Sequence, residues 1–125
     1  MEEIEKEITI YPEYEFECEY LNEERTGKTK EYHEGRLIFE GEYLKGKRNG
    51  KGKEYYCGDL IFEGEYLNGQ KNGKGYVYND NDILIFEGEY LNGLKNGKGK
   101  EFYNNGEIEF GIIKNIVKRI IYISY

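Results

Sequence analysis

The sequence predicts an all-β fold, an elongated, twisted, single antiparallel sheet of tandem β-hairpins. The first observation is composition: 17 Gly, 14 Tyr and 6 Phe in 125 residues favour turns and strands over helices. The second is a motif that recurs every 23 or 24 residues. The third is the alternation of aromatic and charged residues within each copy, which is typical of a strand with two different faces.

One hexapeptide marks the repeats. Phe-Glu-Gly-Glu-Tyr-Leu begins at Phe39, Phe62 and Phe86, and a worn copy with Cys in place of Gly begins at Phe16. Atypical terminal repeats are what a stacked array needs to cover its ends. The chain is therefore divided into an acidic N-terminal segment or cap strand (1–15), a degenerate repeat (16–38), three regular repeats (39–61, 62–85 and 86–109) and a degenerate C-terminal half-repeat or cap (110–125).

Each repeat is predicted to be one β-hairpin. In its first strand Phe62 and Tyr66 alternate with Glu63 and Glu65, so one face of the sheet is aromatic and the other is acidic at its centre. An isolated hairpin is only marginally stable in water, so each one must stack on its neighbour to bury its rings. The expected product is a sheet that advances by roughly 10 Å per repeat.

Two asparagine–glycine pairs predict the turn of each hairpin. In the second regular repeat they are residues 68–69 and 72–73, and both pairs tolerate the positive φ that tight hairpin turns require. The second strand is then expected over 74–79. The isoleucine-rich tail fits either an amphipathic helix or a last hairpin. We favour the hairpin, because Gly111 can be aligned with Gly88 of the last regular repeat.

The charge is unevenly distributed. Residues 1–34 hold 12 Glu and four basic residues, whereas residues 35–125 are nearly neutral, so the net charge of −7 belongs to one end. Phosphate binding needs clustered, uncompensated Lys and Arg, so no nucleic-acid partner is expected. Cys18 and Cys57 stand at different phases of the repeat, which does not favour a disulfide. Without a signal peptide or transmembrane pattern, the expected location is cytoplasmic, with the periphery of a membrane or the cytoskeleton as an alternative.

Residues for catalysis and metal binding are scarce. His33 and Ser124 are the only histidine and serine, which leaves almost no material for His-based metal sites or Ser/His/Asp triads. Carboxylate pairs such as Glu63 and Glu65 recur in every repeat, which is typical of cross-strand partners for lysine and not of an acid–base pair. We therefore predict no enzymatic activity, no catalytic residue, no metal and no cofactor.

The string F-E-G-E-Y-L-N-G-x-K-N-G-K-G resembles the MORN repeat (membrane occupation and recognition nexus), whose usual form is Y-E-G-E-W-x-N-G-x-x-x-G-x-G. The match is good over about 39–111 and weak over 16–38, with tyrosine where tryptophan is common. Residues 103–108 lean toward the related antitoxin-like variant repeats. The resemblance implies a rod or groove of hairpins that acts as a scaffold. Such arrays often bind a peptide or helix of a partner, dimerise, or lie beside a membrane-associated or catalytic domain.

Three functions are open. The first is a scaffold or adaptor that receives a protein partner of unknown identity on its aromatic face, although the same rings could instead stack on one another as the core. Its candidate residues are Tyr43, Tyr66, Tyr90, Tyr55, Tyr78 and Phe102. The second is a weakly membrane-associated or phosphoinositide-binding module whose basic turns line up along one edge. Its candidates are Lys45, Lys47, Arg48, Lys51, Lys71, Lys74, Lys95 and Lys98. The third is a self-associating rod, a homodimer through the C-terminal end.

Overall fold

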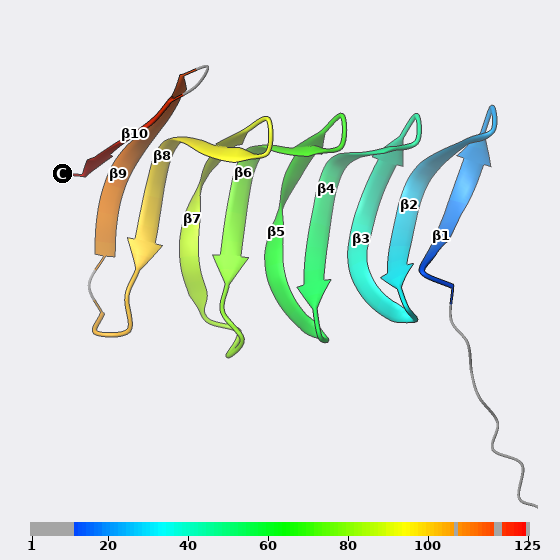
Figure 1. Cartoon of the computed structure of the whole chain (residues 1–125), viewed down its shortest axis with the longest axis horizontal. Coiled ribbons are helices and arrows are strands. Elements are labelled where there is room, and N and C mark those ends of the chain that lie inside the picture. Colours follow the sequence, from blue (N-terminus) through cyan, green and yellow to red (C-terminus); the bar gives the residue numbers. More distant parts are fainter. Residues whose placement is uncertain (1–11, 107, 117–118, 125) are drawn as a thin grey trace, which may run out of the picture.

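The computed structural model describes residues 12–106, 108–116 and 119–124; for 109, 110, 113–116 and 119–124 it describes the backbone only. In these residues ten strands form a single antiparallel sheet in chain order, a row of hairpins side by side (Figure 1). The predicted fold class is confirmed. The strands are β1 (Tyr14–Leu21), β2 (Glu24–His33), β3 (Arg36–Leu44), β4 (Lys47–Tyr56), β5 (Asp59–Leu67), β6 (Gln70–Tyr78), β7 (Leu84–Leu91), β8 (Leu94–Phe102), β9 (Ile108–Ile116) and β10 (Arg119–Ser124).

Only the first asparagine–glycine pair of a repeat makes the turn. Asn68 and Gly69 have φ of 50° and 87°, the two left-handed residues of a tight hairpin turn. Strand β6 already begins at Gln70, so the predicted strand start at residue 74 is wrong. Gly73, with φ of 102°, lies instead in a bulge of β6. The pairing there jumps from Gly64↔Gly75 to Tyr66↔Lys71, which leaves two extra residues on β6.

The core lies on one side of the sheet, here called the aromatic face. Neighbouring repeats meet through rings packed edge to face: the Phe62 and Tyr66 centroids are 5.9 Å apart within a repeat, and the Phe62 and Tyr90 centroids are 5.4 Å apart between repeats. Each such pair contributes about 0.5–1.5 kcal/mol beyond the area it buries. Every repeat is therefore locked to the next. The buried rings are Phe39, Tyr43, Phe62, Tyr66, Phe86 and Tyr90.

A row of glycines across the strands makes room for these rings. A Cβ at Gly75 would lie 2.7 Å from both the Phe62 and Tyr90 rings, too close for any side chain. In the degenerate repeat Thr29 takes the equivalent place opposite Gly41 and is 2% exposed. The rings therefore lie directly on backbone, which leaves the sheet free of central side chains on this row.

The hairpins are also tied together at their tips. The Gly69 amide donates to the Arg48 carbonyl at 2.8 Å, and Gly93 makes the equivalent bond to Lys71 at 2.9 Å. At the C-terminal end, Gly111 of β9 pairs with Gly99 of β8, and β10 pairs with β9. The predicted last hairpin is therefore confirmed for the described backbone.

Candidate functional site

The six aromatic residues predicted as one binding surface lie on both faces of the sheet. Tyr43, Tyr66 and Tyr90 are only 8%, 5% and 8% exposed, because they form the core of the aromatic face. Tyr55, Tyr78 and Phe102 belong to second strands and are half-buried on the opposite face. Side chains alternate between the two faces along a strand, so a residue an odd number of positions from the glycine row lies on the opposite face. Tyr55, Tyr78 and Phe102 are such residues.

A basic side chain covers each phenylalanine of the aromatic face. Three of the eight predicted lipid-binding residues have this role, since a cation above a ring is attracted by its electron-rich face. The cation-to-centroid distances are 4.0 Å for Arg48 over Phe39, 4.0 Å for Lys71 over Phe62 and 3.8 Å for Lys95 over Phe86. These cations therefore cover the phenylalanine rings of the aromatic face.

Carboxylates lie beside all three of these cations, at 3.8 Å between Lys95 Nζ and Glu101 and at shorter distances for the other two. Arg48 Nε donates to Glu31 at 2.8 Å and Arg48 Nη1 to Glu54 at 3.2 Å, while Lys71 Nζ lies 3.1 Å from the same Glu54. Burial of Arg48 opposes its charge, but the hydrogen bond and charge of Glu31 outweigh it, so the pKa of Arg48 is raised. The arginine is thus fixed as a cation between two repeats.

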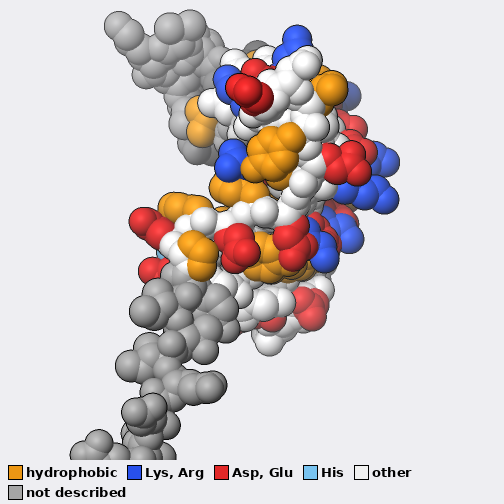
Figure 2. All heavy atoms as spheres, turned by 90° about the vertical axis from the view of Figure 1, so that its right-hand side faces the viewer, with side chains coloured by type: hydrophobic (Ala, Val, Ile, Leu, Met, Phe, Trp, Pro, Cys, Tyr) orange, Lys and Arg blue, Asp and Glu red, His pale blue; other side chains and the backbone are white. Residues whose placement is uncertain are grey.

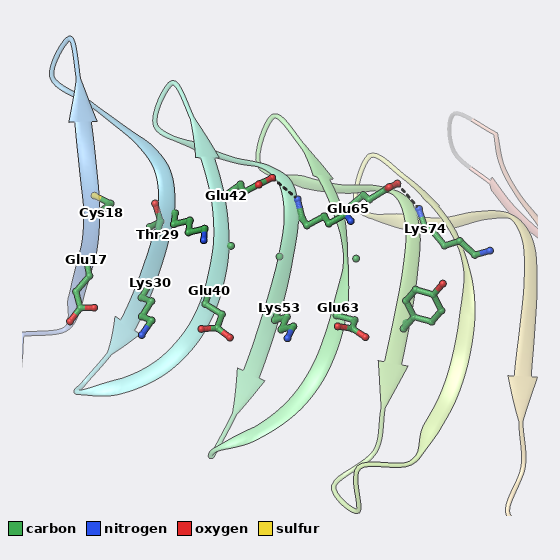
Figure 3. A pocket seen from close by; sticks show the side chains of 16 residues that line it. Glu17, Cys18, Thr29, Lys30, Glu40, Glu42, Lys53, Glu63, Glu65 and Lys74 are labelled. Atoms are coloured by element: carbon green, nitrogen blue, oxygen red, sulfur yellow. Dashed lines mark hydrogen bonds between the residues drawn. The ribbon is translucent and has the colours of Figure 1, made fainter.

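The opposite face, here called the groove face, carries a groove of about 890 Å³ across β1–β6. Two rows of charged side chains border it, with glycine backbone between them (Figure 3). Seen along the array, acidic and basic side chains are interleaved down one side of the molecule (Figure 2). The first row is Glu17, Lys30, Glu40, Lys53, Glu63 and Tyr76. The second row is Lys28, Glu42, Lys51, Glu65 and Lys74.

The glutamates of the second row bind backbone. Glu42 accepts a hydrogen bond from the Lys51 amide at 3.2 Å, and Glu65 accepts one from the Lys74 amide at 3.1 Å (Figure 3). These amides follow the bulge, where the ladder between the strands is interrupted, so the carboxylate replaces a missing carbonyl. Beside it, a Cβ at Gly73 would collide with the Glu65 carboxylate. This structural role was not predicted from the sequence.

Two glutamates of the first row, Glu40 and Glu63, bind tyrosine. The Tyr55 hydroxyl donates to Glu40 at 2.6 Å, and the Tyr78 hydroxyl donates to Glu63 at 2.8 Å. Burial first, and then the bond to Glu40, raise the pKa of Tyr55 to about 12. The same causes, with Glu63 as acceptor, raise the pKa of Tyr78 to about 12. The carboxylate pairs of the three regular repeats are therefore engaged within the sheet. A cross-strand lysine partner, as predicted, is seen at Glu87, 3.4 Å from Lys100.

The lysines that line the groove differ from its glutamates in their bonding. Within the described part of the chain, their ammonium groups make no ion pair or hydrogen bond, and all five side chains are exposed. The groove is formally balanced in charge, and the groups that remain available to a ligand are these five cations and one exposed carboxylate, Glu17, for which no bond is seen among the described residues. These lysines are Lys28, Lys30, Lys51, Lys53 and Lys74.

The eight basic residues predicted for lipid binding do not share one edge. Arg48, Lys71 and Lys95 lie over the aromatic rings, while Lys51, Lys74 and Lys98 follow the bulges toward the groove face. Lys45 and Lys47 are exposed at one hairpin tip. The predicted C-terminal dimer surface falls on residues whose side chains lie outside the described ones.

Other chemistry finds little support in the described residues. No group of three or more His, Cys, Asp or Glu there could hold a metal ion. None of the described residues forms a helix long and apolar enough to cross a membrane. Cys18 and Cys57 are both free thiols, and Cys57 accepts a weak hydrogen bond from Arg36 at 3.7 Å.

Comparison with known proteins identifies the repeat. The family profile of the MORN repeat matches three tandem segments, residues 39–58, 62–82 and 86–108, which together span half of the chain. No curated protein gives a significant match. Repeats of this type indicate a scaffold or binding module and are generally non-enzymatic. The matched segments coincide with the hairpins that carry the aromatic core and most of the groove, and the chain belongs to the MORN-repeat family.

Proposed function

We propose that this chain is a non-enzymatic scaffold that holds a segment of a partner protein in the groove of its charged face. The groove carries the proposal, because it is about 890 Å³ in volume and its floor over β3–β5 is glycine backbone. A chain lying on such a floor can approach the sheet closely. The charged rows on both sides would orient it.

The aromatic face is a weaker choice for the partner. Its rings are buried, they pack on one another between repeats, and cations with carboxylate partners cover them. A ligand there would have to displace contacts that hold the hairpins together. The proposed surface therefore moves from the face of Tyr66 to the face of Tyr55 and Tyr78.

Peptide selection tests this function. Peptides from a random display library would be selected on the full-length protein, and their footprint mapped by backbone amide chemical shifts. Shifts concentrated at residues 28–30, 51–53 and 63–65 support the proposal. A footprint around Arg48 and Lys71, or the recovery of no binder, contradicts it.

An uncharged residue supplies a matched variant. Tyr76, in β6, lines the groove. Tyr56, the last residue of β4, is 70% exposed. Tyr76→Ala should weaken a groove-bound peptide about tenfold, as expected for an interface tyrosine. Tyr56→Ala should leave the affinity unchanged. Equal losses in both variants would remove the groove from the interface.

A further inference from the structure

The lysines of the groove recur at a regular spacing. They come only from the even-numbered strands β2, β4 and β6, while the glutamates come from β1, β3 and β5. Neighbouring strands are about 4.8 Å apart, so strands that bear lysine recur about every 10 Å along the array. The register fixes this order, because Lys53 pairs with Glu40 on one side and Glu63 on the other.

The two signs of charge are not equally available. The Glu63 and Glu65 carboxylates already accept the Tyr78 hydroxyl and the Lys74 amide. Lys51 and Lys53, on the preceding strand, are exposed and make no ion pair or hydrogen bond among the described residues. A basic ligand would meet carboxylates that each already accept a hydrogen bond of the fold and offer only their remaining lone pairs. An acidic ligand meets ammonium groups with free donor positions.

We infer that the groove takes an acidic polypeptide segment whose carboxylates recur about every 10 Å. This inference rests on the proposed function. An α-helix lying along the array supplies the spacing with one acidic residue in seven, about 10.5 Å. A polyproline II segment supplies it with one in three, about 9.3 Å. A uniformly acidic segment fits less well, because half of its carboxylates would face the glutamate-bearing strands.

Designed peptides test the spacing and the sign of charge. Binding of labelled 22-residue peptides to the full-length protein would be measured by fluorescence anisotropy at low and at physiological salt. One helical peptide carries Glu every seventh residue on one side, one has the same composition with Glu every fifth residue, and one carries Lys in place of Glu. A proline-rich peptide with Glu every third residue completes the set, and it distinguishes the extended ligand from the helix.

The expected result is a ranking. A peptide with the 10 Å period should bind at least about fivefold more tightly than the peptide with the wrong period. The reason is that each exposed ion pair raises the affinity roughly twofold to fivefold. Added salt should weaken it. The Lys peptide should show no binding. Equal binding by the Glu and Lys peptides, or by both periods, would overturn the inference.

Two double variants locate the effect. Lys51→Gln with Lys53→Gln removes one pair of groove lysines, and should weaken the periodic peptide about fivefold to tenfold. Lys45→Gln with Lys47→Gln removes the same charge at an exposed hairpin tip, and should change nothing. Equal losses in both would mean that net charge, and not the groove, attracts the peptide. Co-sedimentation with anionic vesicles that depends on Lys51 and Lys53 alone would assign the lysines to a lipid surface and overturn the inference.

Failure of this inference can be told from failure of the proposed function. Selected peptides that footprint the groove without an acidic preference would leave the scaffold function standing and reject the acidic ligand. If neither selected nor designed peptides perturb the groove amides, both proposals fall.

Discussion

The two faces of the sheet use the same kind of residue in opposite ways. On the aromatic face, Lys71 lies over the ring of Phe62 and 3.1 Å from Glu54. Three residues further along the same strand, Lys74 is exposed on the groove face and has no ion pair among the described residues. The first lysine stabilises the fold and the second is available to a ligand. Residue type alone therefore does not decide which residues bind; the face of the strand does.

The bulge keeps this division regular. It adds two residues to the second strand, because Gly64 and Tyr66 are two residues apart while their partners Gly75 and Lys71 are four apart. An even insertion preserves the alternation of faces on both sides of it. The glycine row therefore stays on the aromatic face and the lysines that line the groove stay on the other.

The largest effect is expected from the buried rings, and the contrast between the two faces fails if these rings do not stabilise the array. Tyr66 and Tyr20 have the same place in their repeats, but Tyr66 is 5% exposed and Tyr20 is 63% exposed. Tyr66→Ala should lower the free energy of unfolding by about 3–5 kcal/mol. Tyr20→Ala should change it by less than about 0.5 kcal/mol. Urea denaturation followed by circular dichroism measures both, and similar losses would contradict the assignment of the core.

Alkaline pH provides a second test of the aromatic face. Burial is the main cause that raises the pKa of Tyr43 and Tyr90 from 10.0 to about 12. Because the folded pKa lies above the unfolded one, this stabilisation is fully present below pH 10 and is lost as the pH rises toward 12. The Tm should therefore be insensitive to tyrosine ionisation below pH 10 and then fall steeply. A Tm that stays constant up to pH 11.5 would be inconsistent with these buried hydroxyls.

The cations that cover the rings should have a smaller effect. Arg48 lies over Phe39 and is paired with Glu31, whereas its neighbour Lys47 is exposed. Arg48→Met should lower the free energy of unfolding by about 1–2 kcal/mol, from the lost cation–ring contact and the unpaired carboxylate. Lys47→Met is the control and should be near neutral. An unchanged Arg48→Met protein would show that the rings need no cation above them.

The smallest effect on stability is expected in the groove. Lys51→Gln with Lys53→Gln should change the free energy of unfolding by less than about 0.5 kcal/mol, because both side chains are exposed and have no ion pair with any described residue. The same variant is expected to bind the periodic acidic peptide less tightly. A large loss of stability would mean that the groove lysines belong to the fold, and the contrast between the faces would disappear.

Much of the fold could be predicted from the sequence. The spacing of Phe39, Phe62 and Phe86 defines the hairpins, and the alternation around Gly64 predicts one aromatic and one acidic face. The turn at Asn68-Gly69 follows from its chemistry. Local rules were sufficient here because each described strand pairs with the strands next to it in the chain.

The site was harder to predict, because it depends on contacts between repeats. Nothing local distinguishes Asn72-Gly73 from a turn, whereas in the folded sheet this pair lies in a bulge beside which Glu65 accepts the Lys74 amide. Likewise, the sequence around Arg48 is typical of a surface residue, and its contacts with Phe39 and Glu31 become evident only in the folded array. Counting in twos from Gly52 would have placed Tyr55 on the groove face.

Tip-to-tip bonding has a consequence for how such a chain can grow. The Gly69 amide donates a hydrogen bond to the Arg48 carbonyl of the preceding repeat. A duplicated repeat would therefore carry both the donor and the acceptor that join it to its neighbours. One added repeat of 23 residues, such as 39–61, would lengthen the sheet by roughly 10 Å. It would carry one more ring pair on one face and one more lysine strand on the other. A single gene-duplication event could therefore extend the stable core and the ligand footprint by the same step.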